Sequence, residues 1–135
     1  MSKRNDILDL WRIEPDLIYS GFCTDRAQLK QGRRELLNAL VEVQLCVDWL
    51  QLQEWGQRVT PNSPSSYSLK HAVERAVGHY IGNGCLIAAA ILLGVPYMKY
   101  SGSPNAAVAI KRTNRKRALL GSGFYGYRLL QESYT

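Results

Sequence analysis

Four side chains of the types used in proton transfer lie close together in the sequence: Tyr67, Lys70, His71 and Glu74. Steps of three and four residues place them on one face if the segment is a helix. His71 and Glu74 could then form an acid–base pair, because neutral histidine exchanges protons near pH 7. No nucleophile or electrophilic stabiliser accompanies them, so we expect a hydrogen-bonded structural face, and we predict no catalytic residues and no enzyme.

The sequence predicts neither a metal site nor a cofactor. His79 lies eight positions after His71, and the two lack the cysteine or carboxylate spacing of a zinc site. The three cysteines, Cys23, Cys46 and Cys85, are widely spaced and form no CxxC pair. We therefore expect reduced, mostly buried thiols in a cytoplasmic protein.

The strongest functional signal is a basic run at residues 111–117, KRTNRKR. Its cationic members, which we predict to bind nucleic acid, are Lys111, Arg112, Arg115, Lys116 and Arg117. Such a cluster can contact phosphates, and Thr113 and Asn114 can add hydrogen bonds to them. The nearby aromatic residues that could stack on bases are Tyr97, Tyr100, Phe124, Tyr125 and Tyr127.

The charge distribution supports this interpretation. The chain has 135 residues, 46% of them apolar, and a net charge of +6. Residues 1–98 hold ten basic and ten acidic residues, whereas residues 99–135 hold seven basic residues and one acid, Glu132. The whole net charge therefore lies in the last quarter of the chain, which indicates contact with a polyanion. The composition predicts one globular domain, 1–135, with a basic, Tyr/Gly-rich segment at 107–135.

Helices must position these residues. A short helix is expected from about residue 6 to Ile13, because Pro15 disfavours helix at Glu14. Apolar residues at helical spacing then predict a long helix from Thr24 to Gly56, bent at Gly32. Residues 57–66, with two prolines, read as a loop.

A second helix follows, capped by Ser65 or Ser66, and it carries the Tyr67–Glu74 face. After the turn GNG at 82–84, a third helix is expected at 85–93, ending at Gly94 with Pro96 beyond. Residues 97–100 and 106–111 fit a β-hairpin around SGSPN. Nine apolar residues at 85–93 are too few to span a bilayer, so we expect no membrane partner.

The GNG turn allows three interpretations. A phosphate-binding loop would need a strand before it, and here a helix precedes it. A DNA-reading helix-turn-helix would need polar side chains on its second helix, and residues 85–93 have none. We favour the third interpretation, a buried hairpin. In it Gly82 and Gly84 allow a tight reversal, Asn83 tolerates a left-handed backbone, and an alanine-rich helix enters the core.

The segment from Ser65 to Asn105 resembles a family of short uncharacterised proteins of phages, plasmids and integrative elements. The shared pattern is SSYxxKHxxE, then YxxNGxxIAAA, a glycine and PN. It is carried here by Ser65, Ser66, Tyr67, Lys70, His71, Glu74, Tyr80, Asn83, Gly84, Ile87, Ala88–Ala90, Gly94, Pro104 and Asn105. The resemblance covers about the middle third of the chain and implies an accessory protein of a mobile element.

We expect a mainly α protein in which the long helix packs on the 66–93 helical hairpin, with a small β or irregular C-terminal part. The expected function is non-specific nucleic-acid contact, DNA or RNA, through the Lys/Arg cluster. The alternative is a protein-binding inhibitor of a host defence complex, of the anti-CRISPR or anti-restriction type, whose partner would be a nucleoprotein. A homodimer is also compatible with the sequence, because the apolar faces of the long helix and of the 85–93 helix could be buried between two copies.

Overall fold

The fold is mainly α. A computed structural model describes residues 3–111 of the chain. Its helices are α1 (Lys3–Leu10), α2 (Leu29–Leu37), α3 (Leu40–Gln51), α4 (Ser66–Val77) and α5 (Asn83–Leu93), with a 3-10 turn at Arg26–Gln28. Its strands are β1 (Leu17–Ile18), β2 (Gly21–Phe22), β3 (Tyr97–Lys99) and β4 (Ala106–Val108).

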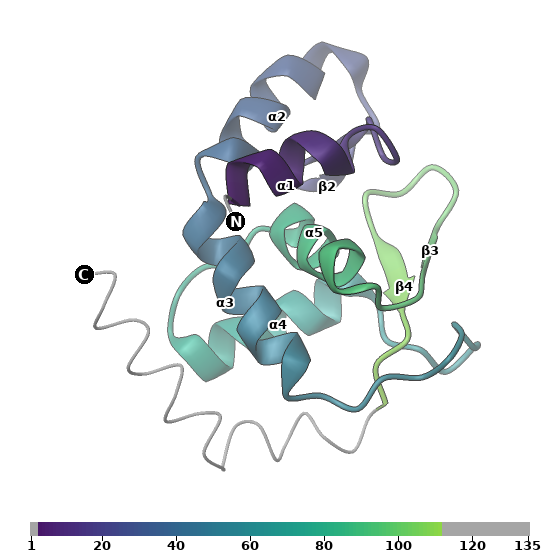
Figure 1. Ribbon diagram of the computed structural model, residues 1–135. Coiled ribbons are helices and arrows are strands. Elements are labelled where there is room, and N and C mark those ends of the chain that lie inside the picture. The colour runs from purple at the N-terminus through teal and green to yellow at the C-terminus, as the bar shows by residue number, and fades with distance from the viewer. Residues whose placement is uncertain (1–2, 112–135) are drawn as a thin grey trace.

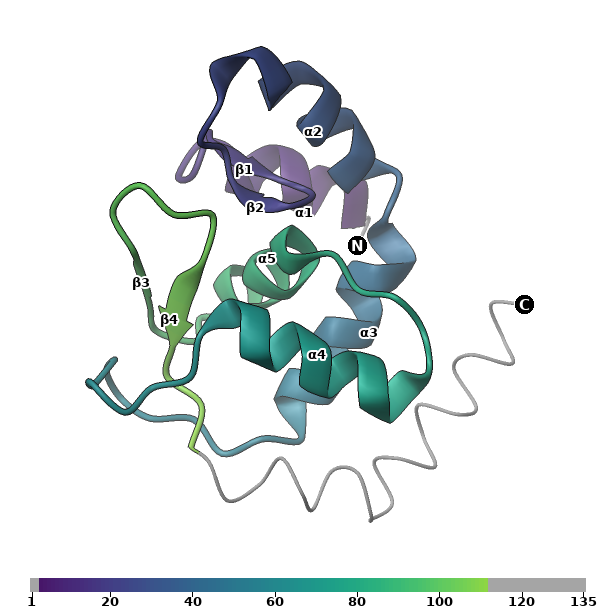
Figure 2. The same cartoon turned by 180° about the vertical axis from the view of Figure 1, so that it is seen from behind.

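Helix α5 lies at the centre of the fold (Figure 1). It contacts α1, α3, α4 and the β1–β2 hairpin. In both views α3 and the β3–β4 hairpin lie on opposite sides of α5 (Figures 1 and 2). Helices α1 and α2 lie above α5 in these views, and α4 lies below it. Every residue from Asn83 to Ala90 is buried, which confirms that this apolar helix belongs to the core.

The single long helix expected from Thr24 to Gly56 is wrong. The chain instead forms α2 and α3, separated at Asn38 and Ala39, and α3 ends at Gln51. Gly32 is not the bend, because it lies inside α2 against the Ile18 side chain, where a Cβ atom would come within 2.6 Å of Ile18 Cβ. The break lets α2 pack on β1 while α3 packs on α5.

Helix α4 begins as its sequence predicts and ends earlier than expected, before the GNG turn. The Ser65 hydroxyl oxygen accepts a hydrogen bond from Ser68 N at 3.1 Å, which caps the first turn. Gly78, with a φ of 68°, ends the helix in the left-handed conformation. The chain therefore reverses at Gly78, and Asn83 is helical rather than left-handed, which corrects our expectation for the GNG turn.

Two small hairpins complete the fold. Strands β3 and β4 pair antiparallel, with Tyr97 opposite Val108, which confirms the expected hairpin. Strands β1 and β2 pair antiparallel, with Leu17 opposite Phe22, and this hairpin was not expected. Its turn contacts the start of α5, because Gly84 N donates a hydrogen bond to Tyr19 O at 2.8 Å.

The cysteines are free thiols, as expected, with Cys46 and Cys85 buried and Cys23 half-buried. Burial raises the pKa of the Cys46 and Cys85 thiols well above its usual value, which keeps both thiols protonated. No helix within residues 3–111 combines the length and the apolar character needed to cross a membrane.

Candidate functional site: a polar network on helix α4 and a basic groove between α1 and α2

The predicted polar face on α4 is present, and Glu74 is its centre. The Glu74 carboxylate accepts hydrogen bonds from Lys70 Nζ at 3.1 Å and from Ile81 N at 3.0 Å. His71 Nδ1 lies 2.8 Å from the other carboxylate oxygen. The Tyr67 ring packs edge-on against His71, with 4.5 Å between the ring centroids. The helix therefore brings these side chains together at the spacing that the sequence indicates.

The environment of Glu74 favours its charged form. Burial alone would raise the pKa of this carboxyl. The hydrogen bonds from Ile81 and Lys70, the positive charge of Lys70 and the contact with His71 outweigh burial and lower the pKa below its usual value. A carboxylate held in this way is a weak proton acceptor, and its geometry suits a clamp that fixes the turn after α4.

The low pKa of Glu74 predicts a loss of stability in acid. The pKa of the Glu74 carboxyl is lower in the folded protein than its ordinary value of 4.5, which applies in the unfolded chain. The contribution of this carboxylate to the free energy of unfolding is therefore complete above the unfolded-state pKa, and it declines as the pH falls toward the pKa of the folded protein. We expect the free energy of unfolding, measured in urea between about pH 6 and about pH 3, to fall more steeply in the wild type than in Glu74→Gln. Parallel curves would contradict this prediction.

A second carboxylate, Glu42 on α3, holds the other side of the same turn. It accepts hydrogen bonds from Tyr19 O–H at 2.7 Å and from Gly82 N at 2.8 Å. Burial, together with the hydrogen bond and charge of Glu42, raises the pKa of the Tyr19 hydroxyl above its usual value. No pattern in the sequence indicates this role, because Glu42 is one charge among several on an amphipathic helix.

Asn83 belongs to a different network from Lys70 and Glu74. Its side-chain amide donates to Ser20 O at 3.2 Å, to Pro104 O at 3.3 Å and to Asn105 Oδ1 at 3.0 Å. It therefore joins the β1–β2 turn, the β3–β4 hairpin and the start of α5. Tyr67, Lys70, His71 and Glu74 therefore lie together on α4, whereas Asn83, another polar residue of the shared pattern, lies in a separate network.

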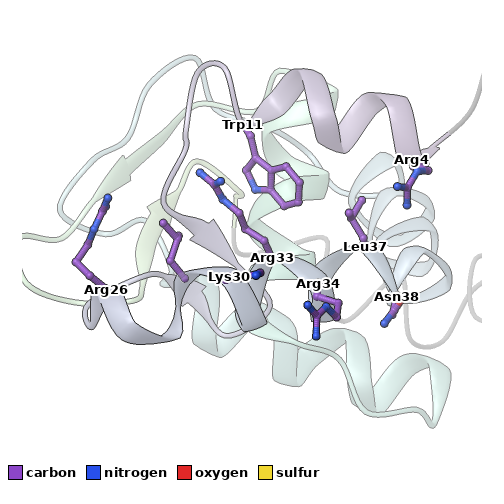
Figure 3. A pocket seen from close by; sticks show the side chains of 9 residues that line it. Arg4, Trp11, Arg26, Lys30, Arg33, Arg34, Leu37 and Asn38 are labelled. Atoms are coloured by element: carbon purple, nitrogen blue, oxygen red, sulfur yellow. The ribbon is translucent and has the colours of Figure 1, made fainter.

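A basic groove that was not expected from the sequence lies between α1 and α2 (Figure 3). This groove, of about 550 Å³, has five basic side chains and no acidic one in its lining. Its lining residues are Arg4, Trp11, Arg26, Leu29, Lys30, Arg33, Arg34, Leu37 and Asn38. Arg4 comes from α1, and Lys30, Arg33 and Arg34 come from α2. We call this surface the basic groove.

Two of these arginines are held by the protein itself. Arg33 donates through Nε to Pro15 O at 3.2 Å, and its guanidinium lies 5.2 Å from the centre of the Trp11 ring. Arg26 Nη1 pairs with Asp16 Oδ1 at 2.9 Å, and the Arg26 side chain is exposed while that of Asp16 is half-buried. Trp11 is fixed in turn, because its indole N–H donates to Leu17 O at 2.8 Å.

The other three basic side chains of the groove remain available. Within residues 3–111, Arg4, Lys30 and Arg34 form no ion pair, and all three are exposed. Arg34 makes only a long hydrogen bond of 3.4 Å to Gln31 Oε1. The groove therefore presents unneutralised positive charge around an aromatic side chain, which suits a phosphate-bearing polymer.

A sequence signal for the groove existed. Four basic residues and no acid lie between Arg26 and Arg34, and the spacing of Lys30, Arg33 and Arg34 places them on neighbouring positions of one helix. The equal numbers of basic and acidic residues in positions 1–98 concealed it, because a total over many elements says nothing about one face.

Only the first member of the predicted basic cluster lies within the described residues. Lys111 Nζ is 3.7 Å from Glu54 Oε1, with both side chains more than half exposed. Arg112, Arg115, Lys116 and Arg117 lie outside the described residues, as do the predicted stacking residues Phe124, Tyr125 and Tyr127.

Of the two predicted stacking residues within the described range, Tyr100 is exposed and Tyr97 is held in place. The Tyr97 hydroxyl donates to the buried carboxylate of Glu14, and Lys99 pairs with the same carboxylate at 3.0 Å. Burial and this carboxylate raise the pKa of the Tyr97 hydroxyl. Tyr97 therefore anchors the β3–β4 hairpin to Glu14, in the segment that follows α1, and is not free to stack on a base.

No group of three or more His, Cys, Asp or Glu side chains in residues 3–111 is arranged to hold a metal ion. The family models, the curated proteins and the solved structures with which the chain was compared gave no match.

Proposed function

We propose that the protein binds nucleic acid through the phosphate backbone, with the basic groove as one contact surface. The observation that carries the proposal is the lining of that groove, which has five basic side chains and no acidic one. Arginine and lysine side chains that face solvent without a carboxylate partner gain by neutralising phosphates and releasing counterions. Binding of this kind is largely independent of base sequence and depends steeply on salt.

The cluster that begins at Lys111 is a second contact surface in this proposal. Five basic residues in the seven positions 111–117 supply the same phosphate-binding chemistry as the groove. Two basic segments on one chain raise the total number of phosphate contacts, and hence the affinity and the salt dependence. The resemblance of the Ser65–Asn105 segment to proteins of mobile elements fits a role in the handling of DNA or RNA.

Removing charge from the groove is expected to weaken binding. Lys30→Ala together with Arg34→Ala removes two exposed cations that form no ion pair within the described residues, so the fold should be unaffected. We expect about tenfold lower affinity for a labelled oligonucleotide at about 100 mM salt, and a salt slope smaller by about two. Fluorescence anisotropy on single-stranded DNA, duplex DNA and RNA across a salt series measures both quantities.

A matched control removes the same charge elsewhere. Arg12 and Arg75 are exposed and do not line the groove, so Arg12→Ala with Arg75→Ala should change affinity by less than about threefold. Equal losses of affinity in the two double variants would mean that binding depends only on the net charge of the protein. The basic groove would then not be a specific contact surface. The variant with alanine at all five cationic positions of 111–117 should also bind less tightly. Unchanged binding in both basic-surface variants would refute the proposed function.

A further inference from the structure

A second hollow lies where α4, the start of α5 and the β1–β2 turn meet, a region that Figure 2 shows at the middle of the molecule. Its volume is about 300 Å³, at the lower end of the range for small-molecule sites. Its lining residues are Tyr19, Ser20, Tyr67, Lys70, Tyr80, Gly82, Asn83, Pro104 and Asn105. We call it the tyrosine pocket. Among the described residues, it shares no lining residue with the basic groove.

Two exposed aromatic rings stand over one buried cation in this pocket. Tyr67 and Tyr80 are 52% and 63% exposed, whereas Lys70 is 5% exposed. The Lys70 ammonium lies 4.4 Å from the centre of the Tyr80 ring and 5.5 Å from that of Tyr67. Exposed aromatic rings are costly in a protein surface, and such rings beside a hollow are suited to stacking on a planar ligand.

Polar groups at the base of the pocket have hydrogen-bonding capacity to spare. Within the described residues Lys70 Nζ makes one hydrogen bond, to Glu74, although an ammonium group has three donors. Asn105 accepts from the Asn83 amide through Oδ1, so the orientation of its own amide is fixed, and its Nδ2 makes no hydrogen bond within residues 3–111. A ligand with carbonyl oxygens or ring nitrogens could accept from both groups.

The charge of the pocket determines the class of ligand. Lys70 is neutralised by Glu74 at 3.1 Å, and Glu42 lies directly behind Gly82. The two carboxylates lie behind the lining, where they offset the positive charge that would attract a free anion, whereas a cation would meet the ammonium of Lys70. A neutral, planar ring with hydrogen-bond acceptors is the ligand that satisfies the tyrosines, the lysine and the amide together, and a nucleobase has all these properties.

We propose that the tyrosine pocket binds a single nucleobase, taken from an unpaired position of the bound strand. The choice of a nucleobase rests on the proposed function, because nucleic acid is the polymer that the basic groove would bring to the protein. The base contacts the rings of Tyr67 and Tyr80, and Lys70 donates a hydrogen bond to a ring acceptor. The Lys70–Glu74 ion pair is then a support that holds the donor in place beneath the rings.

The test compares a short single-stranded oligonucleotide with an abasic strand of the same length and charge, by fluorescence anisotropy on the full chain. We expect the wild type to prefer the base-bearing strand by about tenfold, the typical effect of one stacked base. Tyr67→Ala with Tyr80→Ala should abolish this preference and leave binding of the abasic strand unchanged. Tyr67→Phe with Tyr80→Phe should retain it, because the rings remain.

The control is Ile13→Ala with Leu52→Ala, which removes two exposed apolar side chains that line neither the tyrosine pocket nor the basic groove, and it should retain the preference. Equal wild-type affinity for the two strands would overturn the inference while the proposed function stands. A preference that survives the double alanine variant would overturn it as well.

If neither strand binds, the proposed function fails, and binding of free nucleosides then tests whether the tyrosine pocket accepts a base. A nucleoside titration followed by amide NMR shifts is the readout in that case. Shifts at Gly82, Asn83 and Asn105 that disappear in the double alanine variant would support the pocket, and no shifts would overturn it.

Discussion

Gly84→Ala is expected to destabilise the protein by about 3 kcal/mol or more, because two backbone carbonyls of the β1–β2 turn occupy the space that a Cβ atom would need. A Cβ atom at this position would lie 1.8 Å from Ile18 O and 2.8 Å from Tyr19 O. Neither carbonyl can rotate away like a side chain. The start of α5 would have to move off the β1–β2 turn, which would also break the hydrogen bond from Gly84 N to Tyr19 O.

Urea unfolding followed by tryptophan fluorescence measures this effect, since Trp49 is completely buried. The matched control is Gly56→Ala. The nearest atoms to its Cβ would be Arg58 O at 3.5 Å and the Ala109 side chain at 3.7 Å, which are ordinary contacts. We expect a change below about 1 kcal/mol there. Similar effects at the two glycines would contradict the close packing of α5 on the β1–β2 turn.

Glu74→Ala is expected to cost about 3–5 kcal/mol, because it leaves a buried cation without its partner. The Lys70 side chain is only 6% exposed, and its ammonium pairs with Glu74 at 3.1 Å. The substitution also removes the acceptor of Ile81 N, a backbone donor in the turn that leads to α5. Both losses act on the same side of the core, so the folded state as a whole should lose stability.

The control for this variant is Glu35→Ala, which removes an exposed carboxylate from α2 that forms no ion pair within residues 3–111. Its effect should stay within about 0.5 kcal/mol. Lys70→Met combined with Glu74→Gln should recover most of the lost stability. The pair becomes neutral, and the glutamine oxygen can still accept from Ile81 N. A double variant as unstable as Glu74→Ala would show that the cost does not come from the unpaired lysine.

The sequence predicted the elements whose signals are local. Ser65 caps α4, Gly94 ends α5, and helical spacing brings Lys70 next to Glu74. These features depend on residues within one or two turns of each other, so a pattern in the chain is enough to reveal them.

Features that depend on distant residues were missed. The break at Asn38 and Ala39 carries no glycine or proline, and it follows from the different neighbours of α2 and α3. The strands β1 and β2 are two residues each, too short for a periodic signal. The basic groove joins charges from α1 and α2, and only the packing of these helices brings Arg4 near Lys30.

Close packing against the β1–β2 hairpin explains why both glycines of the GNG turn are needed. Gly82 would place a Cβ atom 2.7 Å from the Tyr19 ring, and Gly84 would place one 1.8 Å from a backbone carbonyl. The sequence indicated a tight turn there, whereas the structure shows a close approach between α5 and a hairpin some sixty residues earlier. A glycine required by a distant partner looks the same in the sequence as one required by a turn.

The central position of α5 has a consequence for synthesis on the ribosome. Helices α1, α3 and α4 and the β1–β2 hairpin all bury apolar surface against α5, and all of them precede it in the chain. None of these elements can complete its packing until residues 83–93 have left the exit tunnel. The nascent chain therefore keeps these apolar faces exposed until α5 emerges, and the core can close only then.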